Sequence, residues 1–557
     1  MLSDRRRSLL AKTPLIAFLF VPFALAPGWA DGFTSAKWHV LAGLAGVLLL
    51  GERWLSDCVG LPRLSSSAWR WCAVLAVVVV AGGLRHGLVW AQQPLVARGA
   101  FVALALAAFW SFRRTRLRLA PLRTAVLVAA AIVVGLGLAQ FAGFDSLAWL
   151  GTGDHLSATF GNVNMAAQFL GLSLVILLSA PRADEPRALR WSTGLVAALV
   201  AAYLALAGTR SVALAMTVAL GVLAFLGRPG FARLCRIGIG AVFVASLVRG
   251  SPVAPRPVAQ VVQASKETSA QMRLAVWADT LEMIRRRPLG VGAGNFEHAF
   301  MPYALAGRSR PGEDLVFRSP HNEYLRLFAE EGLAGGLILL ALLVALVRAL
   351  HRCPAVARWR SEPGALLAGG GAFLAVEACF QFPFELAWPS LVAGVLLGLA
   401  LACLDDPGSE CGEPAFVPSR SRLGDAACVV LAAGLLFGTA RLALAAGLAA
   451  RVDDVAALDR ACALDPRQVE ACVRAAWRHS VAGEHLATRR GLEALLVRSP
   501  AYFPALKLLG EDLLGEGQAE AGCRQLRLYD GLFHGHSSLH ERVEVTCPPA
   551  PRGSQRM

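Results

Sequence analysis

Charged residues are scarce in this chain. Only 17% of its 557 residues are charged, whereas a soluble domain carries roughly 25%. Hydrophobic residues make up 56% of the chain, and the mean hydropathy is +0.53. Apolar runs recur as far as residue 450 and are separated by short arginine-rich loops. This pattern excludes an ordinary soluble enzyme and indicates an all-α, polytopic bundle of membrane helices.

Metal-binding and nucleotide-binding motifs are also missing. The 12 cysteines include no Cys-x-x-Cys pair, so the sequence predicts no zinc site. The glycines of "RRRPLGVGAGNF" (285–296) match no nucleotide fingerprint and predict a tight turn instead. The net charge of +15 does not indicate a nucleic-acid partner, because the arginines fall in alternate loops. We therefore expect no cofactor, no metal and no nucleic acid.

Hydropathy predicts about thirteen membrane spans. Their ranges are 14–28, 36–51, 70–83, 98–112, 122–143, 160–180, 192–208, 210–227, 233–248, 326–350, 364–381, 387–404 and 424–448. Several are shorter than the ~20 residues that a straight span needs, so their boundaries are approximate.

The loop charges predict the orientation. Four arginine-rich loops fall on the side of the basic N-terminus: 113–123, 181–190, 227–236 and 348–360. Loop 143–158 falls on the other side and has no lysine or arginine. Because basic loops stay in the cytoplasm, the N-terminus is predicted to be cytoplasmic. Loop 249–320 and the chain after residue 451 then face the periplasm of a bacterium, with the bundle in the inner membrane.

The chain divides into three predicted parts. Residues 1–450 form the membrane domain, residues 451–547 a periplasmic repeat domain, and residues 548–557 a disordered tail. In the repeat domain Pro466 and Pro500 lie 34 residues apart, which is the tetratricopeptide period. Each proline follows an apolar-periodic helix and begins another. A short tetratricopeptide-like array that binds a protein partner is the favoured interpretation, and a generic helical cap is the alternative.

Four cysteines lie in the predicted periplasmic part: Cys462, Cys472, Cys523 and Cys547. An oxidising compartment favours disulfides, and four cysteines allow three pairings. Cys462 and Cys472 flank Pro466 on consecutive predicted helices. We therefore expect at least one disulfide, and Cys462–Cys472 is the favoured pair.

The outer face carries residues that suit transfer from a lipid-linked pyrophosphate. An enzyme outside the cytoplasm has no ATP, so its substrate must bring the energy, usually as a pyrophosphate leaving group. Arginine binds phosphate oxygens bidentately, and histidine is a suitable base near neutral pH. Arg210 lies in the turn "LAGTRSVALAM" and Arg273 in the amphipathic stretch "SAQMRLAVWADTLEMI". The structural alternatives are a snorkelling helix-end arginine and a solvated helix face.

The stretch "SPHNEY" precedes the apolar run of one predicted span. Ser319 is a good N-cap and Pro320 is favoured at the first helical position, which places His321 in the first turn. The helix dipole there favours neutral imidazole and attracts phosphate. The alternative is that His321 and Asn322 merely satisfy the free end of the helix.

These residues resemble the signature of the O-antigen ligase and polymerase superfamily of bacterial membrane glycosyltransferases. The ligase motif is His, then Asn, Ser or Gln, nine residues, Gly, two residues and Gly; it matches His321, Asn322, Gly332 and Gly335. Four further pieces occur in the family order: "TFGNVNMAAQFL" with Asn162 and Asn164, "GTRS", "GVGAGNF" and "FQFPFELAWP". The resemblance covers roughly residues 120–405.

The resemblance implies a type-C glycosyltransferase fold and an undecaprenyl-pyrophosphate-linked glycan as donor, with no required metal. It implies that His321 is catalytic and that Arg210, Arg273 and Asn322 bind substrate. Arg285, Arg286 and Arg287 compete with Arg273 for the role of the loop arginine. Glu330 occupies the family's acidic position and is expected to orient a neighbour.

The resemblance leaves the acceptor open. We favour O-antigen ligation to lipid A–core because the signature is complete. A polysaccharide polymerase and a protein O-oligosaccharyltransferase are the alternatives, and the repeat domain favours them. A different class is a non-enzymatic transporter of lipid-linked saccharides, for which Glu377 is the main polar residue within a span. Another is an assembly scaffold.

Overall fold

The computed structural model describes most of the chain. The described residues are 13–26, 29, 33–55, 87–114, 119–144, 156–179, 186–226, 256–309, 317–352, 361–404, 422–533 and 537–547, with scattered positions between 70 and 86. Every regular element within them is a helix, which confirms the all-α prediction. The predicted disordered tail, 548–557, lies outside the described residues.

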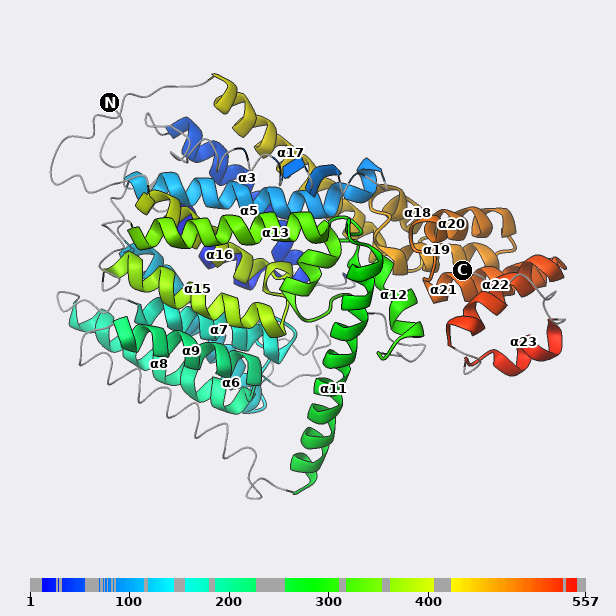
Figure 1. Ribbon diagram of the computed structural model, residues 1–557, viewed down its shortest axis with the longest axis horizontal. Helices are drawn as coiled ribbons and strands as arrows, with labels where there is room; N and C mark the ends of the chain where they lie inside the picture. The colour runs from blue at the N-terminus through cyan, green and yellow to red at the C-terminus, as the bar shows by residue number, and fades with distance from the viewer. Residues whose placement is uncertain are drawn as a thin grey trace.

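The membrane domain is a bundle of helices that run alongside one another (Figure 1). Eight helices in the described ranges are long and apolar enough to cross a membrane. They are α3 (Thr34–Leu55), α5 (Leu88–Arg114), α6 (Ala120–Phe141), α8 (Arg187–Ala207), α13 (Glu323–Arg352), α15 (Glu362–Phe380), α16 (Ala387–Leu404) and α17 (Arg422–Ala449). The chain is therefore a multi-pass membrane protein, as predicted.

The remaining predicted spans correspond to shorter or undescribed segments. The apolar helices α7 (Val163–Leu178) and α9 (Arg210–Leu226) have fewer than 18 residues, and α2 (Thr13–Phe20) has 8. The predicted span 233–248 lies outside the described residues, and 70–83 is described only in part.

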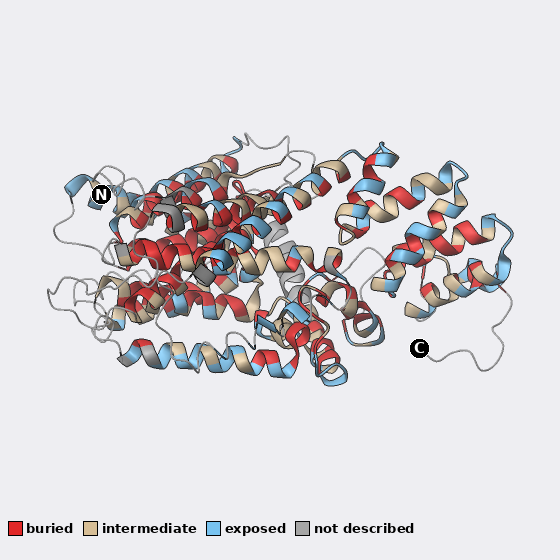
Figure 2. Cartoon of the chain, turned by 90° about the horizontal axis from the view of Figure 1, so that it is seen from above, coloured by how far each residue is buried: buried red, intermediate tan, exposed pale blue. Residues whose placement is uncertain are grey.

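Small residues allow close packing in the interior of the bundle. Buried residues line the facing sides of the helices (Figure 2). Gly398 of α16 lies against α5, where an added Cβ would be 2.5 Å from the Ala105 carbonyl oxygen. Lipid supplies no hydrophobic driving force between membrane helices, so their association depends on van der Waals contacts. Small residues such as glycine strengthen these contacts because they let the backbones approach closely.

The predicted outer loop contains two helices, α11 (Arg256–Arg286) and α12 (Phe296–Ala306). The C-terminal end of α11 lies at the bundle, and the rest of this helix extends away from it (Figure 1). A segment between α11 and α12, which we call the glycine turn (Pro288–Asn295), contacts the backbone of α13. The α13 helix is kinked at this contact, where Gly332 has a non-helical φ of 74°.

The C-terminal part lies at one end of the bundle (Figure 1). It consists of α18 (Val455–Leu464), α19 (Val469–Val481), α20 (His485–Arg498), α21 (Phe503–Gly515), α22 (Ala519–Leu532) and α23 (His540–Thr546). Consecutive helices pack against one another. This order is compatible with helix-pair repeats, and the tetratricopeptide assignment stays a prediction.

Two disulfides are present in the C-terminal helices. Cys462–Cys472 joins α18 to α19, which confirms the favoured pair. Cys523 of α22 is bonded to Cys547, which follows α23, and the sequence did not predict this second pairing.

Candidate functional site

His321 lies just before α13, not in its first turn as predicted. The side chain of Asn322 caps the helix, with its Oδ1 accepting a hydrogen bond from Leu325 N at 3.0 Å. Ser319 is not the cap; its Oγ accepts from His321 N at 3.3 Å. His321 itself has a φ of 51°, in the left-handed region that non-glycine residues rarely adopt. Two good N-cap residues are present in this stretch, and asparagine caps the helix in the folded protein.

The His321 ring is half-buried and incompletely paired. Its centroid lies 5.1 Å from that of Phe382, at an interplanar angle of 61°. Its Nδ1 is buried and has no hydrogen-bond partner among the described residues. Burial and the positive charge of Arg273 lower the pKa of His321 from 6.5 to about 4, against a hydrogen bond with the Gln381 side chain. The imidazole is therefore neutral at pH 7, and in the tautomer protonated at Nε2 its Nδ1 presents a lone pair.

Helix α11 brings Arg273 to this histidine. One turn after Arg273, Trp277 donates from Nε1 to the Pro320 carbonyl oxygen at 2.8 Å, which fixes α11 against the segment before α13. The Trp277 ring also lies 6.3 Å from the ring of Phe380. Residues four positions apart share a helix face, so the Trp277 contacts hold this face of α11 where the charge of Arg273 acts on His321. Burial lowers the pKa of Arg273, and the charge of Glu377 opposes this shift.

The start of α9 is linked to His321 through Gln381. Gln381 Nε2 donates to Ser211 Oγ at 3.3 Å, and its side chain is also hydrogen-bonded to His321. Arg210 precedes Ser211 and has an exposed side chain at the N-terminus of α9. The structure therefore brings His321 and Arg273 together and places the start of α9, with Arg210, one hydrogen-bonded residue away.

Glu377 belongs to the same cluster. It is fully buried at the last turn of α15 and accepts a hydrogen bond from Gln168 Nε2 of α7 at 3.0 Å. The sequence suggested Glu377 as part of a polar path through the bundle. In the structure it lies within the electrostatic range of Arg273, at the end of the span. Its position favours the site near His321 over a path across the membrane.

The matched family adds an independent observation on this cluster. Residues 195–340 match the O-antigen ligase family model. The matched segment, residues 195–340, contains Arg210, Arg273, His321 and Asn322. It supports the O-antigen ligase and polymerase superfamily and an enzyme of the membrane glycosyltransferase kind. A comparison with curated proteins yields no match.

Glu330, which also lies within the matched segment, belongs to an ion-pair cluster. Arg98 of α5 contacts Glu330 Oε2 at 3.2 Å and also forms an ion pair with Glu331. Arg326 contacts Glu330 Oε1 at 3.2 Å and Glu385 Oε1 at 2.6 Å. Glu330 thus joins α5 to α13, and Arg326 extends this cluster to the segment after α15. The orienting role of Glu330 stays a prediction.

The arginines that competed with Arg273 have other contacts. Arg285 and Arg286 bind Glu282 on their own helix, at 2.7 and 2.6 Å. Arg287 is exposed after the end of α11. These contacts leave Arg273 as the arginine of α11 whose charge acts on His321.

The two asparagines of the resemblance lie at the start of α7. Asn162 is the N-cap, and its Oδ1 accepts a hydrogen bond from Asn164 N at 2.8 Å. Asn164 is exposed. Their observed role is to begin the helix that carries Gln168, the hydrogen-bond partner of Glu377.

Sequence reasoning missed several residues that surround His321. Trp277, Gln381 and Ser211 carry no chemical signature alone, since their roles depend on contacts between segments distant in the chain. Gln381 and Phe382 do lie in the "FQFPFELAWP" stretch that resembles the family. This stretch was a usable signal, but it did not show which of its residues faces the histidine.

Proposed function

We propose that the protein transfers a glycan from undecaprenyl pyrophosphate to an acceptor hydroxyl at the periplasmic face of the inner membrane. The observation that carries this proposal is the buried Nδ1 of His321, which has no hydrogen-bond partner within the described ranges and lies in the electrostatic range of Arg273. A buried polar atom without a partner is costly. A free lone pair next to a cation suits a base that works on a substrate bound through an anionic group.

In the proposed reaction His321 takes the proton from the acceptor hydroxyl. The oxygen attacks the anomeric carbon of the donor, and the bond between that carbon and the pyrophosphate oxygen breaks. The electron pair of this bond stays on the pyrophosphate, so undecaprenyl pyrophosphate leaves. Arg210 and Arg273 stabilise the growing negative charge, while Asn322 sets the start of α13. The bound proton is then lost from His321 to solvent.

The donor also tunes the base. Burial and the charge of Arg273 lower the pKa of His321, which makes the histidine neutral but weakly basic. A pyrophosphate bound at Arg273 offsets that positive charge and raises the pKa of His321 toward neutrality. The histidine then becomes a stronger base when the donor is in place, and this limits proton transfer to the loaded site.

We favour lipid A–core as the acceptor, because His321, Asn322, Gly332 and Gly335 complete the ligase motif. A second lipid-linked glycan or a protein hydroxyl would use the same base and the same arginines. The cytoplasmic N-terminus and the periplasmic C-terminal domain are part of this proposal and rest on the loop charges. A periplasmic reporter fused at residue 557 tests this orientation, and activity of a cytoplasmic reporter would reverse it.

The decisive experiment is transfer by the purified protein in liposomes. The donor is an undecaprenyl-pyrophosphate glycan, and three acceptors are offered separately: lipid A–core, a second lipid-linked glycan and a serine-containing peptide. We expect transfer to lipid A–core, insensitive to a metal chelator. Transfer only to the second lipid-linked glycan would identify a polymerase instead of a ligase. Transfer only to the peptide would identify a protein glycosyltransferase. No transfer to any acceptor would overturn the enzymatic proposal.

A deletion strain provides the matching cellular measurement. Loss of the ligase leaves lipopolysaccharide without its ladder while long glycan accumulates on the carrier. Loss of a polymerase leaves a single repeat on the lipid A–core instead. An unchanged lipopolysaccharide ladder would show that the protein acts on a glycan other than the O-antigen.

A further inference from the structure

We propose that Arg467 of the C-terminal domain is a positioning residue for the transfer site, acting through the glycine turn on α13. The proposal rests on the proposed function of His321 and adds a role for the repeat domain. Arg467 lies in the short loop between α18 and α19. Its side chain leaves the repeat domain and reaches the membrane domain.

The Arg467 guanidinium binds the backbone of two distant segments. Its Nε donates to the Trp90 carbonyl oxygen at 2.6 Å, and its Nη1 to the Gly294 carbonyl oxygen at 2.6 Å. Its Nη2 donates to Asn295 Oδ1 at 2.6 Å and, at 3.4 Å, to the Ala293 carbonyl oxygen. The guanidinium also lies 4.8 Å from the Trp90 ring centroid. Lysine could not reproduce this planar set of donors.

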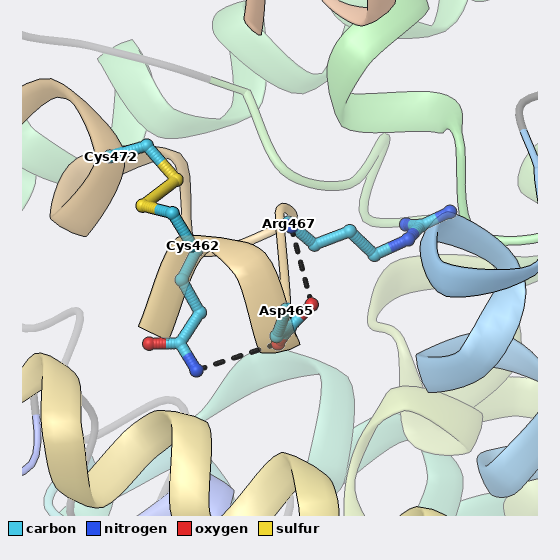
Figure 3. The surroundings of a disulfide bond; sticks show 5 residues. Cys462, Asp465, Arg467 and Cys472 are labelled. Carbon is cyan, nitrogen blue, oxygen red and sulfur yellow. Dashed lines mark hydrogen bonds between the residues drawn. A yellow bond between two sulfur atoms is a disulfide. The ribbon is translucent and has the colours of Figure 1, made fainter. Parts of the chain in front are cut away.

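The loop that carries Arg467 is held from both sides. The Cys462–Cys472 disulfide closes it, and Asp465 Oδ1 accepts from Arg467 N at 3.2 Å (Figure 3). Asp465 Oδ2 also accepts from the Gln468 side chain at 3.4 Å. In Figure 3 the Arg467 side chain points away from the disulfide, toward α5. The guanidinium is therefore presented from a constrained loop, which lowers the entropy lost when it binds.

The glycine turn is joined to α13 by backbone hydrogen bonds. Val291 N donates to the Ala329 carbonyl oxygen at 3.0 Å, and Gly292 N to the Glu330 carbonyl oxygen at 2.8 Å. In return, Leu333 N donates to the Pro288 carbonyl oxygen at 2.9 Å. These bonds satisfy the groups that the kink of α13 releases from the helical pattern.

The contact between the two backbones depends on glycine. A Cβ added to Gly290 would lie 2.3 Å from the Glu330 carbonyl oxygen. Gly290 also has a φ of 72°. No other residue fits such a conformation at this separation without strain. The backbones of the glycine turn and α13 are therefore in direct contact, and a displacement of the turn displaces α13 as well.

The contacts form a continuous path to the candidate base. Arg467 holds Gly294 and Asn295, the turn holds Ala329 and Glu330, and the first segment of α13 begins at the Asn322 cap beside His321. At 1.5 Å per residue, this helical segment is roughly 12 Å long. Without Arg467 the turn loses donors on its outer side and can move. The α13 segment before the kink then shifts, and His321 shifts with it.

Hydrogen exchange of the full chain in detergent tests the mechanical part without any substrate. We expect Arg467→Ala to accelerate exchange of the Val291, Gly292 and Leu333 amides relative to the wild type. Arg489→Ala is the matched control, because Arg489 is also partly buried but forms an ion pair with Glu516 inside the repeat domain. Unchanged protection of these three amides in Arg467→Ala would overturn the proposed path.

Transfer kinetics test the functional part. We expect Arg467→Ala to lower kcat by roughly 10- to 100-fold, since a displacement of about 1 Å has this effect on a reacting group. The KM for the lipid-pyrophosphate donor should stay unchanged, because Arg210 and Arg273 are intact. Low-millimolar guanidinium should restore part of the rate in Arg467→Ala, and Arg467→Lys should be intermediate.

Guanidinium rescue separates positioning from simple loss of stability, since added guanidinium cannot refold a destabilised protein. A proportional loss of folded protein, with normal kcat per folded molecule and no rescue, would overturn the positioning role. An inactive wild type would instead show that the proposed function has failed. The exchange measurement then still decides whether Arg467 holds the turn.

The two disulfides offer a further pair of variants. Cys462→Ser with Cys472→Ser frees the loop that carries Arg467, so this double variant should show the same pattern as Arg467→Ala, to a smaller extent. Cys523→Ser with Cys547→Ser removes the disulfide of α22, which lies outside this path. Equal effects of the two double variants on exchange at Gly292 would contradict the proposal.

Discussion

His321 and Glu330 come from the same polar stretch at the start of α13, yet their surroundings are opposite. His321 is half-buried, and its Nδ1 has no hydrogen-bond partner in the described part of the chain. Glu330 is buried, and two arginines hold its carboxylate. Arginine also lies near His321, but there the charge of Arg273 disfavours the protonated ring. In this stretch, His321 therefore keeps a nitrogen available to a substrate, whereas the carboxylate of Glu330 is engaged in ion pairs that join helices.

The comparison shows how to separate function from structure among polar residues at a membrane helix. A polar group near the bilayer is costly in both cases. Glu330 offsets that cost inside the protein through its ion pairs. The Nδ1 of His321 has no partner among the residues that the structure describes, so we expect a substrate group to bind there.

The largest expected effect is on catalysis. His321→Ala should lower the rate of glycan transfer by ~10²–10⁴, the usual loss for a positioned base. Donor binding should change little, because Arg210 and Arg273 are intact. The fall in unfolding temperature should be small, because the ring contributes one hydrogen bond with Gln381 and one contact with Phe382, while its Nδ1 makes no hydrogen bond within the described residues. Single-turnover transfer in liposomes measures the rate, and His540→Ala in the C-terminal domain is the control. A wild-type rate would remove the base role.

The next effect is on stability. Arg326→Ala leaves Glu323, Glu330 and Glu385 without the arginine that they share. Removing one partner of a buried ion pair costs about 3–5 kcal/mol. Denaturant unfolding in detergent should show this loss, and Glu330→Gln should recover part of it in the double variant. If Arg326→Ala were as stable as His321→Ala, the distinction between the two groups would fail.

A smaller loss is expected at the kink that lies between the two halves of α13. Gly332 has a φ of 74°, and an added Cβ would lie 2.5 Å from the Leu289 carbonyl carbon. Gly332→Ala should therefore destabilise the protein by about 1–3 kcal/mol. Gly371→Ala in α15 is the control, because an added Cβ there has no atom within 4 Å. Equal unfolding midpoints for the two variants would contradict the close approach.

The smallest effect concerns pH. Burial and Arg273 lower the pKa of His321 to about 4, so protonation should not reduce wild-type kcat/KM until the pH approaches that value. Arg273→Gln removes a neighbouring positive charge, which makes protonation easier and raises the pKa of His321. The acid limb of kcat/KM, which reports groups of the free enzyme, should then move to higher pH. Superimposable acid limbs would show that Arg273 does not act on His321.

Local patterns predicted much of the fold. Long apolar runs predicted the spans because hydropathy depends on composition within one segment, and eight of these runs form helices long enough to cross a membrane. The positions of Cys462 and Cys472 on consecutive predicted helices, on either side of Pro466, predicted their disulfide. Cys523–Cys547 was not predicted, because its geometry depends on how α23 packs against α22. The predicted start of α13 was wrong. Ser319 and Asn322 are both good N-cap residues, and only the folded backbone decides which of them caps the helix.

The sequence by itself determined the membrane class, the charge asymmetry of the loops and the motif that contains His321 and Asn322. These properties reside in residue types and short spacings. Tertiary structure alone decided that Gln381 links His321 to Ser211, that the charge of Arg273 acts on the histidine, and that Arg467 holds the glycine turn. The reason is physical: a burial, a pKa or an ion pair depends on atoms within a few ångströms, and most of those atoms come from segments far away in the chain.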